Sequence, residues 1–165
     1  MIPSIKKILY ATDLSDNARH VFAYAAAIAH RFNAEIIILH AVEPISPYTQ
    51  QRLGEMIGES QWADMQKTKE QETVDLIRQR LDRFCQEMGS EFNACPFQVA
   101  DILVKRGNAV EAILEQSRSN HCDLIVMGTH GHGTLADVFV GSTARRVIRR
   151  SQVPVMVAHL PENQP

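Results

Sequence analysis

Gly128-Thr129-His130-Gly131 and, nine residues later, Gly141-Ser142-Thr143 form the stretch around which the rest of the chain is organised. The run Asp123–Met127 before it is apolar after its first residue, which is typical of a buried parallel strand, and Ala144–Arg150 behind it is typical of a helix. Glycines at a strand end let the backbone turn and approach a ligand closely. A Gly-Ser-Thr step that opens a helix offers free N–H groups, two hydroxyls and the positive end of the helix dipole. This arrangement favours phosphate binding over a simple serine-capped turn.

The composition is that of one folded domain. The chain has 165 residues, of which 45% are hydrophobic and 22% charged, so we expect a single domain over residues 1–160 and a loose tail at 161–165. A net charge of -2 provides no general attraction to nucleic acid or to anionic membranes, and neither is an expected partner. The apolar runs are shorter than the ~20 residues of a membrane helix. The N-terminus lacks the apolar core of a signal peptide, so a cytoplasmic location is expected.

The three cysteines are Cys85, Cys95 and Cys122. They are odd in number, widely spaced and without a Cys-x-x-Cys pair. This pattern favours reduced, buried thiols over a disulfide framework or a zinc site.

Apolar segments of two periodicities alternate along the chain. Strands are predicted at Ile5–Ala11, Glu35–Ala41, Cys95–Val104, Asp123–Met127 and Val153–His159. Helices are predicted from Ser15 to about Phe32, from about Gln61 to Met88, after Gly107-Asn108, and from Gly141 to about Ser151. Strands that alternate with helices imply βαβ units, a parallel sheet and right-handed crossovers.

Some local features leave alternatives open. Ser15 and Asn108 are the predicted N-caps, and Asn108 with Glu111 has the form of a capping box. Residues 43–60 are either irregular or helical around 50–57. The apolar stripe of the helix at 61–88 suits an ordinary crossover helix, which is favoured, or a contact with a partner.

The sequence also resembles a known family. Gly128-x-x-Gly131, nine residues and then Gly141-Ser142 are similar to the nucleotide-binding signature of the ATP-binding branch of the universal stress proteins. The resemblance extends to Ala11-Thr12-Asp13-Leu14-Ser15, to His40-Ala41-Val42 and to Val153–Val157, so it covers nearly the whole chain. It implies an α/β fold, namely a Rossmann-like open five-stranded parallel sheet of order 3-2-1-4-5 with helices on both faces. It also implies ATP as the ligand and a homodimer through the last strand, Val153 to His159.

The implied strand order brings the ends of strands one and four together at a topological switch point, where open α/β sheets bind ligands. Asp13 would accept a hydrogen bond from the ribose or base or face a metal, unless it serves only as a helix N-terminal carboxylate. Val42 matches the position whose backbone reads adenine, and packing on the helix layer is its other role. Met127 and Gly128 would lie against the sugar and base.

Backbone N–H groups of the two glycine-rich segments would wrap the phosphates. The full set of predicted cofactor-binding residues is Ala11, Thr12, Asp13, Val42, Met127, Gly128, His130, Gly131, His132, Gly133, Gly141, Ser142 and Thr143. The Gly-Lys-[Ser/Thr] of a P-loop is absent. Mg²⁺ or Mn²⁺ would therefore bind through the ATP phosphates rather than a dedicated protein cage, and no metal-ligating residue is assigned.

Two other clusters have simpler interpretations. His130 and His132 would bind a transition metal or contact phosphate, but exposed loop histidines are the favoured interpretation. Four arginines on the last helix would contact nucleic acid or an acidic protein, but a solvated helix face is favoured. They are Arg145, Arg146, Arg149 and Arg150.

Three functional hypotheses follow. The first is an ATP-binding homodimeric regulator that couples nucleotide occupancy to an unknown protein partner under stress. The second is a slow ATPase or other nucleotide-hydrolysing enzyme, although the sequence offers no evident base or arginine finger and no catalytic residue is assigned. The third is a structural dimer without nucleotide, against which the intact glycine pattern argues.

Overall fold

The computed structural model describes residues 2–88, 95–129 and 140–159. The chain forms two compact units. The sheet unit consists of Met1–Val42 and Pro96–Pro165, and the helical unit is Glu43–Cys95. The single domain expected from composition stays a prediction, and the tail at 161–165 lies outside the described residues.

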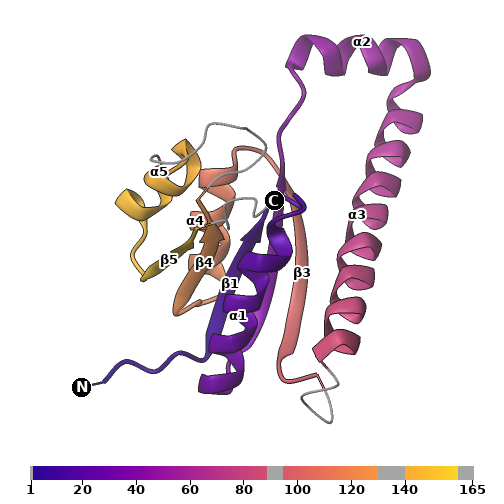
Figure 1. Cartoon of the computed structure of the whole chain (residues 1–165). Helices are drawn as coiled ribbons and strands as arrows, with labels where there is room; N and C mark the ends of the chain where they lie inside the picture. The colour runs from indigo at the N-terminus through magenta and orange to yellow at the C-terminus, as the bar shows by residue number, and fades with distance from the viewer. Residues whose placement is uncertain (1, 89–94, 130–139, 160–165) are drawn as a thin grey trace, which may run out of the picture. The chain divides into compact units, whose positions relative to one another are not determined.

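Five parallel strands form the sheet unit in the order β3-β2-β1-β4-β5, as predicted (Figure 1). They are β1 at Lys7–Thr12, β2 at Glu35–Val42, β3 at Gln98–Arg106, β4 at Leu124–Gly128 and β5 at Val155–Ala158. Each overlaps its predicted segment. The central strand β1 pairs with β2 on one side and with β4 on the other. Strands β2 and β3 thus lie on one side of β1, and β4 and β5 lie on the other. The winding direction changes at the boundary between β1 and β4 in the sheet.

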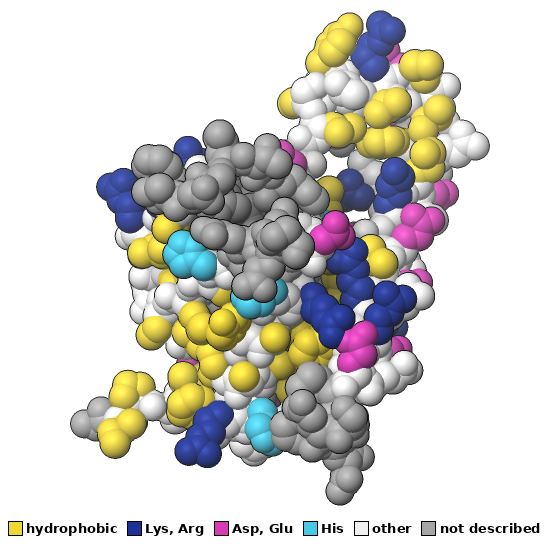
Figure 2. Space-filling view, viewed as in Figure 1, with side chains coloured by type: hydrophobic (Ala, Val, Ile, Leu, Met, Phe, Trp, Pro, Cys, Tyr) yellow, Lys and Arg dark blue, Asp and Glu magenta, His cyan; other side chains and the backbone are white. Residues whose placement is uncertain are grey.

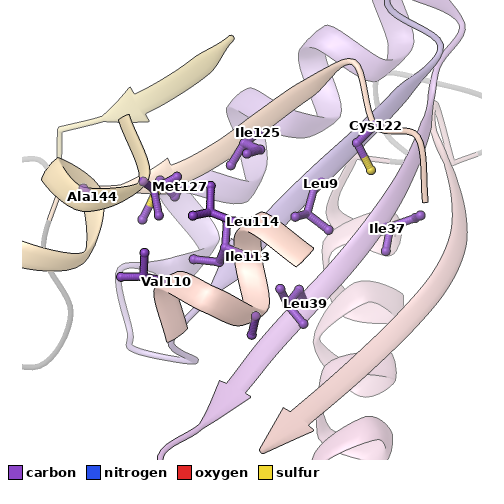
Figure 3. Packing of buried hydrophobic residues seen from close by; sticks show 12 residues of the cluster. Leu9, Ile37, Leu39, Val110, Ile113, Leu114, Cys122, Ile125, Met127 and Ala144 are labelled. Carbon is purple, nitrogen blue, oxygen red and sulfur yellow. The ribbon is translucent and has the colours of Figure 1, made fainter. Parts of the chain in front are cut away.

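Helices cover both faces of this sheet: α1 (Ala18–Phe32) on one, α4 (Ala109–Ser119) and α5 (Ser142–Arg150) on the other. On the α1 face, the ring of Tyr10 contacts that of Phe22 at 5.2 Å between centroids, and its hydroxyl donates to the carbonyl of Ala18 at 2.8 Å. Side chains alternate along a strand, so Leu9 points to the opposite face. There it joins a buried cluster drawn from three strands and both helices (Figure 3), which includes Ile37, Leu39, Val110, Ile113, Leu114, Ile125, Met127 and Ala144.

The helical unit contains α2 (Pro47–Ile57) and the long α3 (Glu59–Met88). The alternative of a helix within 43–60 is confirmed, and it begins earlier than Gln50. Its start is set by Ser46, whose Oγ accepts from the N–H of Thr49 at 3.2 Å. No residue of α2 is buried, and hydrophobic side chains lie on its surface (Figure 2), with Tyr48 and Met56 the most exposed. No helix in the described ranges is long and apolar enough to cross a membrane.

One of the two predicted N-caps was wrong. Asn108 caps α4 as predicted, since its Oδ1 accepts from the N–H groups of Val110 and Glu111 at 3.0 and 3.3 Å. Ser15 does not cap α1, whose N-cap is Asn17 without a side-chain bond. The N–H of Ser15 is instead donated to the Asp13 carboxylate at 3.0 Å, so residues 13–15 form a turn ahead of the helix.

We expect Asn108→Ala to lower the free energy of unfolding by about 1 kcal/mol, because two N–H groups at the start of α4 lose their acceptor. Urea denaturation followed by circular dichroism measures the change. The matched control is Asn17→Ala, which removes a cap residue with no side-chain hydrogen bond and should change stability by less than about 0.5 kcal/mol. Equal effects of the two substitutions would contradict the assigned cap.

The expectation that all three cysteines are reduced was wrong for two of them. Cys85 and Cys95 form a disulfide, with their Cα atoms 5.1 Å apart. The two cysteines are separated by 10 residues in the sequence, and this spacing carries no pairing signal. Cys122 is free and buried, as predicted.

Burial raises the pKa of the Cys122 thiol to about 11, and the nearby charges of Lys7 and Asp123 contribute smaller, opposing effects. The folded state thus holds this proton more tightly than the unfolded chain, for which the reference pKa is 9.0. The stabilisation is complete below the unfolded-state pKa and is lost as the pH rises through the folded-state value. We expect the stability difference between wild type and Cys122→Ala to shrink between about pH 9 and 11. Parallel urea titrations at pH 8, 9, 10 and 11 measure it, and a constant difference would contradict the assigned thiol environment.

Candidate functional site

The carboxyl ends of β1 and β4 lie side by side at the point where the winding direction changes. The last paired positions are Tyr10 and Val126, and Thr12 and Gly128 each lie two residues further along their strands. In open α/β sheets this crevice is where ligands bind. Of the predicted site residues, Asp13 after β1 and Gly128 at the end of β4 are thus brought to the same edge of the sheet.

A tight turn held by its own side chains follows β1. The Thr12 Oγ1 accepts from the N–H of Leu14 at 3.1 Å, and the Asp13 Oδ1 accepts from the N–H of Ser15 at 3.0 Å. Leu14 has a φ of 61°, which non-glycine residues adopt rarely. These bonds fix the Asp13 side chain at the end of the strand.

The second carboxylate oxygen of Asp13 is not paired within the part of the chain that the structure describes. Oδ2 is buried and has no hydrogen-bond partner among the described residues. A buried acceptor without a donor costs free energy, which a ligand donor would recover. A ribose hydroxyl or an adenine amino group is such a donor, so this oxygen fits a nucleoside.

The start of α5 is attached to the end of β4. The N–H of Gly141 donates to the carbonyl of Thr129 at 2.7 Å, and the N–H of Thr129 donates to the carbonyl of Ala158 at 3.1 Å. Helix α5 begins at Ser142, and the Gly141 carbonyl accepts its first intrahelical bond, from Arg145 at 3.0 Å. The N–H groups of the first turn have no acceptor within the helix and carry the positive end of its dipole. They can bind a phosphate at the β4 end of the crevice.

The end of β2 is held by a glycine that the sequence reasoning assigned only to a helix start. The N–H of Gly107 donates to the carbonyl of Val42 at 3.0 Å, and its φ of +136° is a conformation that suits glycine. A carbonyl oxygen has a second lone pair, so Val42 can still accept a bond from a ligand. Its predicted contact with adenine stays a prediction.

His40 was not among the predicted site residues. Its Nδ1 lies 2.9 Å from the carbonyl oxygen of Thr12, which ties the end of β2 to the residue before Asp13. The sequence signal for it was a polar residue directly after the apolar run Ile36–Leu39. The tie connects the two strand ends at which a nucleoside would lie.

The other predicted residues fall into three groups. The side chain of Met127 is in the core, so only its backbone remains for a ligand, and Ala11 packs partly against the same cluster. Gly128 and Thr143 are half-buried, and Ser142 is exposed. His130, Gly131, His132 and Gly133 lie outside the described residues, so their roles stay predictions. Within the described ranges no three His, Cys, Asp or Glu side chains gather as metal ligands would.

All four arginines of α5 are exposed, as a solvated helix face requires. Arg150 forms a two-point ion pair with Glu111 of α4, whose second contact, Nη2 to Oε2, is 3.1 Å. This hydrogen bond holds the pKa of Glu111 below its usual value, with a smaller contribution from the charge of Arg118. The pair joins α4 to α5.

Comparisons with known proteins agree with this architecture. The chain matches the family model of the universal stress protein family over residues 4–159. It is 31% identical over 152 residues to a Thermus aquaticus protein described as the universal stress protein in the QAH/OAS sulfhydrylase 3′ region, covering 92% of this chain and 97% of that protein.

Two solved structures share the fold. One is the universal stress protein UspA from Lactobacillus plantarum, with a TM-score of 0.69, 22% identity, and coverage of 94% of this chain and 99% of that chain. The other is a universal stress protein in complex with cAMP, with a TM-score of 0.62, 22% identity, and coverage of 95% and 98% respectively.

Proposed function

This chain belongs to the universal stress protein family, and we propose that it is an ATP-binding member that acts as a homodimeric, nucleotide-dependent regulator in the stress response. The proposed ligand site is the crevice between the ends of β1 and β4. We place the protein in the cytoplasm. It would act on a protein partner whose identity is not assigned.

The observation that carries the proposal is the buried Oδ2 of Asp13, which no donor among residues 2–88, 95–129 and 140–159 reaches, at the edge of the sheet where α5 begins. A nucleotide site needs an acceptor for the donors of the sugar or base, and it needs N–H groups that bind the phosphates. The Asp13 carboxylate can provide the first and the start of α5 the second. Val42, two residues beyond His40 on the neighbouring strand, supplies backbone groups for the base. The universal stress protein that was solved with cAMP has an adenine nucleotide as its ligand, which supports this ligand class.

A divalent cation, Mg²⁺ or Mn²⁺, would accompany ATP through the phosphate oxygens. The residues present fit this mode, because a cation that keeps most of its waters needs only one or two carboxylates beside the phosphates. Asp13, directly after β1, is a carboxylate at this edge of the sheet. The cation would neutralise phosphate charge, and the α5 N–H groups would orient the phosphates.

The proposed dimer forms through the edge strand β5 within the segment Val153–His159. The strand lies last in the sheet order, and its pairing with β4 leaves its other side as a sheet edge. An edge strand presents a row of unpaired N–H and C=O groups that a second copy can pair with, giving an isologous contact. Pro154 stands just before β5, a position that a proline tolerates at an edge.

Native mass spectrometry of the purified protein, followed by denaturing extraction of bound nucleotide, tests the proposal. We expect a dimer that carries ATP or takes up added Mg-ATP, and that binds ATP more tightly than cAMP because of the extra phosphates. Bound ADP that accumulates from ATP with time would instead favour the enzyme. A dimer that binds neither nucleotide would overturn the proposed ligand site.

A further inference from the structure

The disulfide between Cys85 and Cys95 lies where the helical unit returns to the sheet unit. Cys85 is in the last turns of α3, and Cys95 is the final residue of the helical unit. Pro96 is the first residue of the returning part of the sheet unit. Both cysteines therefore belong to the helical unit, and the disulfide joins α3 to the residue that precedes Pro96 in the chain.

The residues just after Cys95 are fixed to α1. The Nδ1 of His30 lies 3.1 Å from the carbonyl oxygen of Pro96. The ring of Phe97 meets that of Phe22 edge to face, with centroids 5.2 Å apart. The two residues directly after Cys95 thus contact α1. The disulfide holds Cys85 close to these two residues.

We propose that Cys85 and Cys95 are a reversible thiol–disulfide switch that sets the length of the covalent path from Cys85 in α3 to Pro96. In the oxidised chain, α3 connects to the anchored Pro96 through the disulfide and a single residue. In the reduced chain, the same connection runs through the separation of 10 residues between the cysteines. A cross-link restricts the chain between the residues it joins, so breaking the disulfide removes this restraint from the C-terminal end of α3 and favours local opening of the helix there.

The chemistry is thiol–disulfide exchange with a small-molecule disulfide of the glutathione type. One cysteine, as its thiolate, attacks that disulfide and expels a small thiolate, giving a mixed disulfide. The second cysteine then attacks the mixed disulfide at the protein sulfur and releases a second small thiol. The protein pair is oxidised by two electrons, the small disulfide is reduced to two thiols, and the two protein thiol protons pass to those products.

Accessibility separates this pair from the third cysteine. Cys95 is exposed and Cys85 is half-buried, so a small thiol can reach the bond. Cys122 is buried, and burial raises the pKa of its thiol to about 11, so it should not react in the folded protein. If the proposed cytoplasmic location is right, a disulfide there is expected to be transient rather than permanent.

The test equilibrates the full-length protein across ratios of reduced to oxidised glutathione, alkylates free thiols and measures masses. We expect a single reversible transition in which Cys85 and Cys95 gain two alkyl groups together while Cys122 stays unlabelled. Retention of both thiols in fully oxidised buffer, or a bond that dithiothreitol does not reduce in the folded protein, would overturn the proposal.

Amide hydrogen exchange measures how reduction of the disulfide changes local opening of α3. Reduction should accelerate exchange at the C-terminal end of α3 by about tenfold and leave β1 and β4 unchanged. Cys85→Ser and Cys95→Ser should match the reduced wild type in both buffers, whereas Cys122→Ser should still switch. Identical exchange of α3 in oxidised and reduced protein would disprove this restraint. These readouts do not involve nucleotide, so they stand apart from the test of the ATP site.

Discussion

Gly141→Val is expected to weaken ATP binding by about 100-fold or more while the fold remains intact. Gly141 is the N-cap of α5, and its φ of -55° and ψ of 159° are accessible to any residue, so valine introduces no backbone strain. Its N–H donates to Thr129, and a valine retains that N–H. The added side chain would stand beside the N–H groups of the first turn and keep a phosphate from approaching them.

The measurement is isothermal titration with Mg-ATP, together with a melting curve of the unliganded protein. Gly54→Val is the matched control, because Gly54 lies within α2 and an added Cβ there would meet only the Glu59 side chain, at 3.8 Å. The control should retain wild-type affinity. Unchanged affinity in Gly141→Val would show that α5 does not hold the phosphates. A lost fold would show that the glycine is required for packing.

The fold could be predicted because its signals are local or statistical. Strands buried on both faces are continuous apolar runs, and Ile36–Leu39 within β2 is one, so the position of such a strand follows from the sequence pattern alone. The strand order followed from a resemblance that extends across the chain, since periodicity contains no information on which strands are neighbours. Asn108 was identified because its cap is made within three residues of sequence.

The features that sequence reasoning missed depend on tertiary placement. Ser15 has the chemistry of an N-cap, but its N–H satisfies the Asp13 carboxylate, and the helix begins later. Cys85 and Cys95 form a disulfide across a separation of 10 residues, and no spacing rule predicts this pairing. His40 reaches the Thr12 carbonyl because β2 pairs in register with β1, with Thr12 opposite His40. Such contacts exist only once the sheet has formed.

We expect Asp13→Asn to weaken ATP binding by about 10- to 100-fold and to stabilise the unliganded protein. The affinity falls because a hydrogen bond from a ligand to a carboxylate contributes about 1.5–3 kcal/mol. The stability rises, by about 1 kcal/mol, because a neutral amide costs less than a carboxylate when buried without a partner, and the described part of the chain offers Oδ2 none. The remaining side-chain oxygen can still accept from the N–H of Ser15.

The opposite signs of the two effects make this substitution informative. Substitution of a residue with a purely structural role lowers the free energy of unfolding of the protein. Any loss of ATP affinity would then follow from the lower stability. Calorimetric titration with Mg-ATP and urea denaturation of the unliganded protein measure both quantities on the same sample. Asp16→Asn is the control, since Asp16 is exposed in the same segment and loses the same charge. Loss of affinity together with lower stability would mean that Asp13 holds the turn rather than the nucleoside, and wild-type affinity would remove it from the site.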